Sequence, residues 1–168
     1  MNLSYRTLNT LLVVMAVVVS VFVIAYLQNY LFLDPCPLCI FQRIGLWILG
    51  VFAFLAAIFN PKGKTLRLLF WLGGMAGTLW GLGVAARHTW IHYFPSMEMV
   101  ECGPGLNYML ETMPMDDVFS KVLAAPGDCT IIDWTVLGLS IPAQALIMFM
   151  FALVVQGFIL TEIFKNQP

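Results

Sequence analysis

A pair of cysteines separated by two residues, Cys36 and Cys39 in the stretch PCPLC, has the residue types and spacing for redox chemistry. Such a pair can cycle between a dithiol and a disulfide, or it can supply two ligands to a metal ion. Arg43 lies four residues after Cys39, about one helical turn, so its guanidinium can stabilise a thiolate on the same face. The other two of the four cysteines are Cys102 and Cys129. These five residues are the first candidates for a reaction centre.

The residues around the cysteine pair predict that it opens a helix. Asp34 is a suitable cap, and Pro35 and Pro37 suit a first helical turn, because proline has no backbone N–H to leave unpaired there. Cys39 is then expected in the first turn of the helix. The unpaired N–H groups and the positive end of the helix dipole favour a reactive thiolate at that place.

The composition of the chain indicates which elements must position these residues. Of the 168 residues, 61% are hydrophobic and only 10% are charged, which is typical of a membrane protein. A helix needs about 20 mostly apolar residues to cross a bilayer. Four segments meet this requirement: Leu11–Leu31, Ile40–Phe59, Leu66–Ala86 and Ile141–Phe164. We therefore expect an all-α membrane protein, a four-helix transmembrane bundle that forms one domain over residues 1–168.

Basic residues predict which side of the bundle faces the cytoplasm, since Lys and Arg concentrate in short cytoplasmic loops. Lys62, Lys64 and Arg67 lie between the second and third segments, Arg6 precedes the first segment, and Lys165 follows the fourth. We expect this loop and both termini to be cytoplasmic. The first apolar segment is longer than that of a usual signal peptide, so we expect it to remain as a spanning helix.

The two remaining loops, at about residues 32–38 and 89–140, are expected to face outward. The longer loop is acidic, with seven Asp and Glu residues and a single lysine. Its middle part, between the two later cysteines, mixes acidic residues with Leu, Met, Val and Phe. This mixture predicts a short amphipathic helix that lies on the membrane, docks on a partner, or covers the bundle.

All four cysteines fall on the outward-facing side, where disulfides persist if the compartment is oxidising. Adjacency favours a pairing of Cys36 with Cys39 and of Cys102 with Cys129, although four cysteines allow three connectivities and the sequence does not exclude exchange. Two disulfides can serve redox chemistry, or they can simply tie down the loops. A zinc site is the weaker interpretation, because the later two cysteines do not form a second close pair, so we expect no metal.

Four stretches resemble the disulfide bond formation protein B family: PCPLCIFQR at residues 35–43, HTWIHYFPS at 88–96, GDC at 127–129 and WTVLGLSIP at 134–142. Each stretch is short, but their order, spacing and placement among four helices make the combination specific. The resemblance covers nearly the whole chain. It implies a thiol:quinone oxidoreductase of the bacterial inner membrane, which generates disulfides for periplasmic protein folding.

The resemblance also implies a role for each cysteine. Cys102 and Cys129 would form the loop disulfide that accepts electrons from a reduced periplasmic DsbA-like thiol oxidase, with Cys102 in the mixed disulfide. Cys129 would then resolve it, and the resulting dithiol would reduce the Cys36–Cys39 disulfide through a link between Cys129 and Cys36. This leaves Cys39 as a thiolate against the quinone. Arg43 would stabilise that thiolate and the charge that develops on the quinone oxygen.

Further expectations follow from the same resemblance. His88 matches a position near the quinone, and the acceptor would be ubiquinone or menaquinone from the membrane pool. The cysteine loops would be periplasmic, and no nucleic acid is expected as a partner.

Two alternative functions are a membrane scaffold with purely structural disulfides and an enzyme that resembles vitamin K epoxide reductase. In that enzyme, however, the Cys-x-x-Cys pair belongs to a late helix, whereas here it opens the second.

Glycines in the third segment predict a close approach to a neighbouring helix. Gly73, Gly77 and Gly81 recur every four residues and so share one helical face. Gln144 and Gln156 in the fourth segment are expected to form hydrogen bonds inside the bundle.

Overall fold

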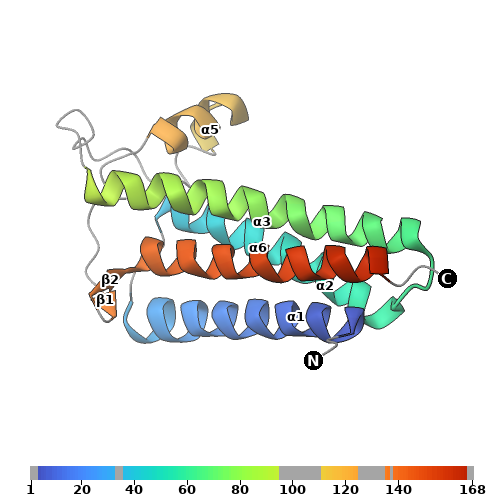
Figure 1. The fold of residues 1–168 in the computed structure, drawn as a ribbon. Coiled ribbons are helices and arrows are strands. Elements are labelled where there is room, and N and C mark those ends of the chain that lie inside the picture. Colours follow the sequence, from blue (N-terminus) through green and yellow to red (C-terminus); the bar gives the residue numbers. More distant parts are fainter. Residues whose placement is uncertain (1–3, 33–35, 95–110, 125–134, 137, 166–168) are drawn as a thin grey trace.

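Four long helices form an elongated bundle in the computed structural model, which describes residues 4–32, 36–94, 111–124, 135–136 and 138–165 (Figure 1). In chain order the elements are α1 (Tyr5–Val21), the π-helix η1 (Phe22–Tyr30), α2 (Pro37–Phe59), α3 (Lys64–Tyr93), α5 (Met115–Ala124), the strands β1 (Thr135–Val136) and β2 (Leu139–Ser140), and α6 (Ile141–Lys165). The helix η1 continues α1 to make a single rod of 26 residues.

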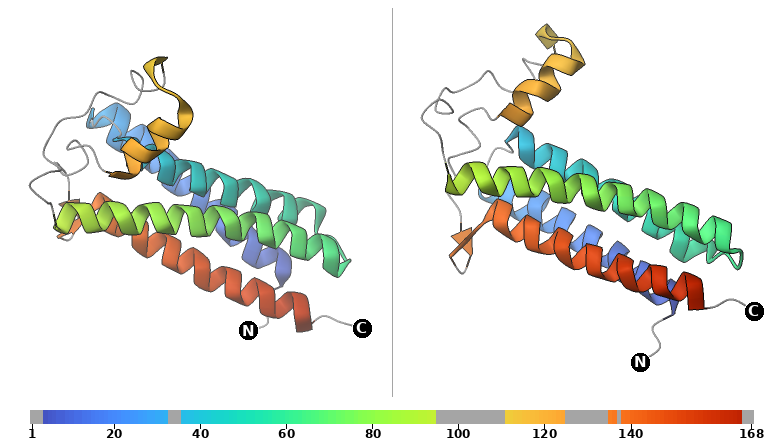
Figure 2. Two further views of the ribbon diagram at one scale, coloured as in Figure 1. Left: turned by 90° about the horizontal axis from the view of Figure 1, so that it is seen from above. Right: turned by 45° about the horizontal axis from the view of Figure 1, so that its top comes forward.

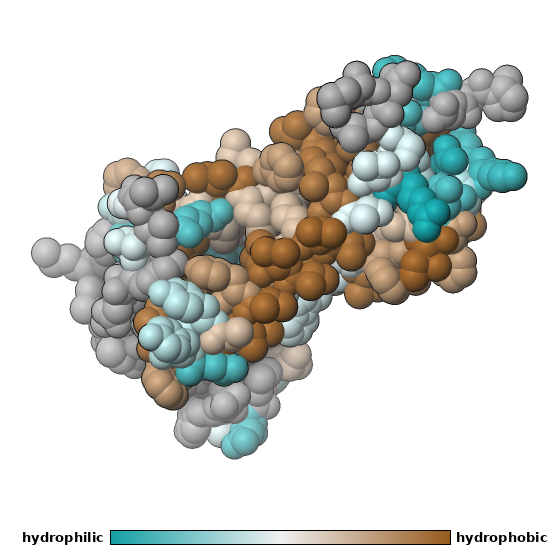
Figure 3. All heavy atoms as spheres, turned by 90° about the horizontal axis from the view of Figure 1, so that it is seen from below, coloured by the Kyte–Doolittle hydropathy of each residue, from teal (hydrophilic) through white to brown (hydrophobic). Residues whose placement is uncertain are grey.

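The four rods have the length and composition of membrane-spanning helices. Their most apolar windows have mean hydropathies between 1.5 and 2.8. Large apolar side chains are exposed along all four rods, such as Val18 on α1, Phe54 on α2 and Phe158 on α6. Figure 3 shows a hydrophobic band across the middle of one face, between more hydrophilic ends. The predicted four-helix transmembrane bundle is therefore confirmed, and the chain is a multi-pass membrane protein.

Local signals set the ends of the helices. Ser4 caps α1, where its side chain accepts a hydrogen bond from the backbone N–H of Thr7 at 3.3 Å. The helix therefore starts at Tyr5, earlier than the apolar run that begins at Leu11. Asn60 ends α2 in the left-handed conformation, with φ 36°.

The third helix is also longer than its apolar run, which we placed at Leu66–Ala86. It continues to Tyr93, because no helix breaker occurs before Pro95 in the sequence. The additional turns carry His88, which lies near this end of the helix.

Glycines bring α2 and α3 into close contact. A Cβ at Gly45 of α2 would lie 2.8 Å from the backbone nitrogen of Gly81, and a Cβ at Gly77 would lie 2.7 Å from the backbone nitrogen of Leu49. A Cβ at Gly81 would also collide with the ring of Phe149 from α6. The predicted glycine face of the third helix is confirmed, and it contacts both α2 and α6.

Some polar side chains inside the bundle form hydrogen bonds between helices. The Nε2 of Gln156 donates to the hydroxyl of Thr78 at 3.3 Å, and Trp71 Nε1 donates to the backbone carbonyl of Gln156 at 2.9 Å. The prediction for Gln156 is confirmed. Gln144 is different, since it donates at 2.9 Å to the carbonyl of Leu139, just before its own helix.

The two ends of the bundle differ in what they carry. Figures 1 and 2 place the start of α1, the end of α6 and the α2–α3 connection at one end. The helix α5 and the antiparallel pair β1–β2 lie at the other end, where α2 begins with its cysteine pair. The structure thus groups the elements as the charge pattern predicted, while the side of the membrane that each end faces stays a prediction.

Candidate functional site

The cysteine pair lies at the start of α2. Cys36 is the N-cap residue, with φ −63° and ψ 157°, and its Sγ accepts a hydrogen bond from the backbone N–H of Cys39 at 3.3 Å. The cap is therefore Cys36 and not Asp34, because Pro37 already occupies the first helical position. Cys39 lies in the first turn, as predicted.

The two sulfur atoms are positioned for exchange chemistry. Both cysteines are half-buried, and the Sγ atoms of Cys36 and Cys39 lie 2.8 Å apart. They can form or release a disulfide with a small side-chain movement. The helix N-terminus beside them supplies unpaired N–H groups that stabilise a thiolate.

His88 reaches the cysteine pair from α3. Its side chain is buried, with 1% exposure, and its Nε2 lies 3.8 Å from the Sγ of Cys36. Its other ring nitrogen, Nδ1, lies 3.1 Å from the Nε2 of Gln42 on α2. A hydrogen bond to one ring nitrogen fixes the imidazole and so decides what the other nitrogen offers to the sulfur.

Gln42 was missed by the sequence prediction. It is buried, with 7% exposure, and it stands three residues after Cys39, on the same side of the helix. A polar residue one turn from a reactive thiol in an otherwise apolar helix is a usable signal. Its partner His88, however, lies 46 residues away in sequence.

Arg43 binds to the first rod through Gln28. Its Nη1 donates to the side-chain oxygen of Gln28 in η1 at 3.0 Å. This contact holds the guanidinium between η1 and the cysteine-bearing end of α2. Gln28 was also missed, since nothing in the sequence pairs it with Arg43.

The helix η1 is a further feature that the sequence did not predict. Its nine residues form a π-helix, a rare geometry that often occurs at functional sites. It provides Gln28 and also Leu27, which is buried at 5% exposure. The wider turn changes which residues of the first rod face α2.

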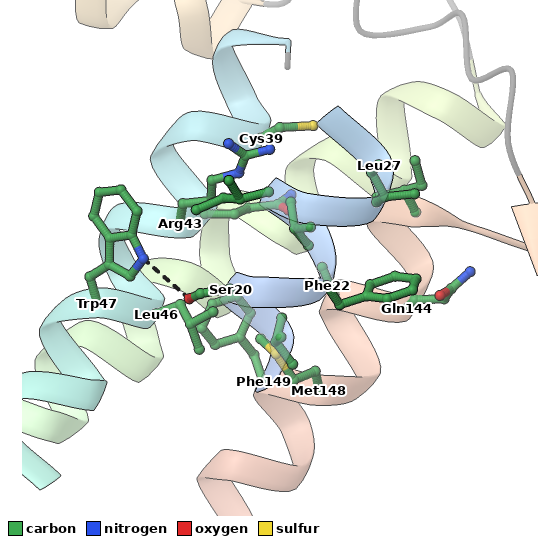
Figure 4. A pocket seen from close by; sticks show the side chains of 16 residues that line it. Ser20, Phe22, Leu27, Cys39, Arg43, Leu46, Trp47, Gln144, Met148 and Phe149 are labelled. Carbon is green, nitrogen blue, oxygen red and sulfur yellow. Dashed lines mark hydrogen bonds between the residues drawn. The ribbon is translucent and has the colours of Figure 1, made fainter. Parts of the chain in front are cut away.

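A cavity of about 290 Å³ lies between the first rod, α2 and α6. Cys39, Gln42 and Arg43 line it from α2, and Gln144 lines it from α6. Most of the remaining lining is apolar: Val19, Phe22, Val23, Ile24, Leu27, Leu46, Ile141, Ala145, Met148 and Phe149. Figure 4 shows Cys39 and Arg43 toward one end of this space. The cavity therefore suits a flat apolar molecule with a few polar atoms.

A hydrogen bond between α1 and α2 also lies at the wall of the cavity. The indole Nε1 of Trp47 donates to the hydroxyl of Ser20 at 3.3 Å (Figure 4). This bond joins α2 to α1, and both residues line the cavity.

The helix α5 covers the start of α2. Val118 is buried, with 1% exposure, against Leu38 and Ile91, and Cys36 packs on the same cluster. A short helix was predicted in the segment between Cys102 and Cys129, and α5 confirms it. This helix contacts the bundle through Val118, and its placement on the membrane or on a partner stays a prediction.

The structure brings together four of the six predicted site residues, which are Cys36, Cys39, Arg43 and His88. The other two, Cys102 and Cys129, lie outside the described residues, so their pairing stays a prediction. Within the described part of the chain, one group of three possible metal ligands converges. It consists of Cys36, Cys39 and His88, whose ligand atoms lie within 4.8 Å of one another.

Comparisons with known proteins show which family this chain is similar to. Residues 5–159 match the family model described as disulfide bond formation protein DsbB. A protein of Psychrobacter sp. (strain PRwf-1) is 50% identical over 165 residues, which covers 98% of this chain and 96% of the relative. One of Acinetobacter baumannii is 41% identical over 169 residues, covering 100% of this chain and 96% of the relative. Both are named disulfide bond formation protein B, which favours this family over one that resembles vitamin K epoxide reductase.

Proposed function

Because the chain belongs to the disulfide bond formation protein B family of disulfide-forming membrane oxidoreductases, we propose that it reoxidises a periplasmic DsbA-like thiol oxidase and delivers the electrons to a membrane quinone. The observation that carries this proposal is the cavity between the membrane helices, which Cys39 and Arg43 line together. A thiol and a cation at one end of an apolar cavity suit an electron acceptor that dissolves in lipid.

The lining of the cavity fits a quinone. A quinone ring is flat and apolar, with two carbonyl oxygens, and it accepts two electrons and two protons on reduction. The residues that would hold it are Arg43, Gln42 and Gln144 for the oxygens, and Leu46 and Phe149 for the ring. A volume of about 290 Å³ is close to the lower limit for a small-molecule site and suits a head group, with a long tail left in the lipid.

The cysteines pass two electrons inward in this proposal. A thiolate of the reduced thiol oxidase attacks Cys102 in the Cys102–Cys129 disulfide and forms a mixed disulfide, so that Cys129 leaves as a thiolate. Cys129 attacks Cys36 in the Cys36–Cys39 disulfide, and Cys39 leaves as a thiolate. The second thiol of the oxidase attacks the oxidase sulfur of the mixed disulfide, which restores the oxidase disulfide and frees Cys102 as a thiolate. Cys102 then attacks Cys129 in the Cys129–Cys36 disulfide, which re-forms the loop disulfide and releases Cys36 as a thiolate.

The start of α2 favours the thiolate form of Cys39. Cys39 lies in the first helical turn, where the helix dipole stabilises negative charge, and Arg43 lines the same cavity. The electrons of the Cys39 thiolate can therefore leave toward the cavity and not toward the water-exposed loops. Re-formation of the Cys36–Cys39 disulfide then completes the cycle.

His88 transfers a proton to or from the sulfur of Cys36. Its Nε2 lies 3.8 Å from Cys36, so the imidazole can protonate Cys36 when it is a thiolate or take up its proton before the disulfide re-forms. Gln42 holds the ring through Nδ1 and keeps Nε2 directed at the sulfur.

The orientation in the membrane belongs to the proposal as well. The end of the bundle with Lys62, Lys64 and Arg67 would face the cytoplasm, and the cysteine-bearing end would face the periplasm across the bacterial inner membrane. In spheroplasts, a membrane-impermeant thiol reagent should then label a cysteine placed at Glu111 and leave one placed at Gly63 untouched. The reverse labelling pattern would contradict this orientation.

Reconstitution tests the activity itself. Purified chain should oxidise a reduced DsbA-like protein only when ubiquinone or menaquinone is supplied, with one quinol formed for each disulfide. Cys39→Ala should stop the reaction. If the intact chain uses neither quinone and its disulfides do not turn over, the two disulfides are structural and the protein is a scaffold.

A further inference from the structure

The geometry points to a second use of the same thiols: we propose that Cys36, Cys39 and His88 of the reduced protein bind a thiophilic divalent cation of the Zn²⁺ class. Among the described residues this is the one group of three such side chains whose ligand atoms converge, all within 4.8 Å. The proposal concerns metal binding alone, so it can be tested whether or not the chain uses a quinone.

The positions of the donor atoms are close to those of a zinc site. With Zn–S distances of about 2.3 Å and Zn–N distances of about 2.0 Å in a tetrahedron, neighbouring donor atoms lie roughly 3.5 to 3.8 Å apart. The Sγ of Cys36 and the Nε2 of His88 already have this separation, at 3.8 Å. The two sulfurs, at 2.8 Å, must separate by roughly 1 Å, which a small rotation of either cysteine side chain provides.

The second ring nitrogen of His88 is already engaged, as in known zinc sites. Metal-bound histidines usually donate from their other nitrogen to an oxygen, which fixes the ring and the tautomer. Gln42 lies 3.1 Å from Nδ1 and can offer its amide oxygen there after a half-turn of the amide. Nδ1 then carries the proton, and Nε2 presents its lone pair toward the sulfurs.

The charges around the group allow a dication to bind. Two thiolates and a neutral imidazole balance the charge of Zn²⁺, and the N-terminus of α2 stabilises the thiolates. Arg43 is the nearby cation on the same helix, and its side chain is hydrogen-bonded to Gln28 of η1. Three protein ligands leave a fourth position for water, as in zinc sites with an open coordination position.

Binding is selective for the reduced protein. Metal binding releases the thiol protons and changes no oxidation state, so no electron acceptor is needed. The disulfide form has no thiolates to offer, and it should not bind. A bound ion holds both sulfurs, so the disulfide cannot form until the ion leaves. The cation would therefore inhibit disulfide formation by this chain.

The test uses the full-length chain in detergent with Cys102→Ser and Cys129→Ser, so that Cys36 and Cys39 are the only cysteines left. Reduced protein is titrated with Co²⁺, whose sulfur-to-metal charge-transfer absorption reports thiolate ligation, and Zn²⁺ is then added as a competitor. We expect one Co²⁺ per chain, displacement by Zn²⁺, proton release on binding, and no uptake by the oxidised protein. Absence of the charge-transfer band in reduced protein would overturn the proposal.

Variants identify the third ligand. His88→Gln should weaken Co²⁺ binding by more than tenfold, while His92→Gln, a matched histidine near the end of the same helix, should leave it unchanged. Gln42→Leu should weaken binding by about 10- to 100-fold, and Gln42→Glu should strengthen it, because carboxylates are good partners for a metal-bound histidine. Equal affinities in the His88 and His92 variants, or no response to either Gln42 change, would exclude the three-ligand site even if one histidine variant folds poorly.

Discussion

The two faces of α2 are packed in opposite ways. Toward α3 the helix presents Gly45, and a Cβ at that position would lie 2.8 Å from the backbone of Gly81, so the two helices touch with no spare space. Toward the first rod and α6 it presents Cys39 and Arg43, which line a cavity of about 290 Å³. The same helix is thus fixed on one face and faces an open space on the other.

This difference separates two tasks around one cysteine pair. The close α2–α3 contact fixes the distance between Cys36 and His88, because the imidazole comes from α3. The open face leaves room beside Cys39 for a ligand. Phe149 contacts both regions. Its ring occupies the place that a Cβ at Gly81 would need, and it also lines the cavity.

Filling the close contact that α3 makes with α2 and α6 should have the largest effect on stability. Gly81→Leu inserts a side chain where even a Cβ would collide with Phe149, so α3 must move away from α6 and α2. Overpacking of this kind costs about 1 to 3 kcal/mol, and more where backbone lies opposite. We expect a clear loss of thermal stability in detergent, together with loss of activity.

Gly83→Ala is the matched control for that change, because a Cβ there meets nothing within 4 Å. In a helix this replacement should stabilise the chain by up to about 1 kcal/mol. Equal stability of the Gly81 and Gly83 variants would show that the close contact does not hold the bundle together.

Removal of the Arg43 guanidinium from the open face of α2 should affect activity more than stability. Arg43→Ala removes charge-assisted hydrogen bonds of about 1.5 to 3 kcal/mol, so quinone use should weaken by about 10- to 100-fold. Arg43→Lys should recover only part of the loss, because lysine lacks the planar fork. The measurement is steady-state oxidation of a reduced DsbA-like protein at varied quinone concentration.

A single-turnover experiment without quinone separates the two steps for Arg43. The first exchange with the thiol oxidase should proceed at nearly the normal rate in Arg43→Ala, since that step uses other sulfurs. Unchanged quinone affinity and turnover in this variant would assign Arg43 a purely structural role.

Gln42 connects the two faces, and its replacement should have a smaller effect. Gln42→Leu removes the hydrogen bond to His88 Nδ1, worth about 0.5 to 1.5 kcal/mol, so re-formation of the Cys36–Cys39 disulfide should slow by about two- to tenfold. The rate is followed by trapping free thiols after reduction. A rate equal to that of the unchanged chain would mean that the orientation of His88 does not limit the step.

Trp47→Phe should have the smallest effect. It removes only the hydrogen bond from the indole to Ser20, on a side chain that is half exposed, and keeps an aromatic ring in the lining of the cavity. We expect a loss of at most about 1 kcal/mol in stability and a less than fivefold change in quinone affinity. A larger change in affinity would show that this bond shapes the cavity itself.

Much of the fold could be predicted because its signals are local. Apolar runs, Pro37 and the basic connection between α2 and α3 predicted four spanning helices and placed Cys39 in a first helical turn. The ends of α1 and α3 were less predictable from hydropathy, since helices continue past the apolar run until a cap or a proline stops them. Ser4 and Pro95 provide those signals.

The contacts of the site were harder to predict. Arg43 was chosen for its spacing from Cys39, but its partner Gln28 lies on another helix, 15 residues away. The π-helical turn of η1 alters which side chains of the first rod face α2, and the sequence shows no mark of it. Gln42 was missed for a similar reason, because its role depends on a histidine from α3.

The sequence by itself determined the membrane helices and the cysteine pair at a helix start, because hydrophobicity, helical period and proline act over a few residues. The tertiary structure decided that His88 faces Cys36 and that a cavity opens beside Cys39. Those features depend on how each helix is rotated and how closely it packs, which glycine contacts between distant segments set. For the same reason, the three converging metal ligands were visible only in the folded chain.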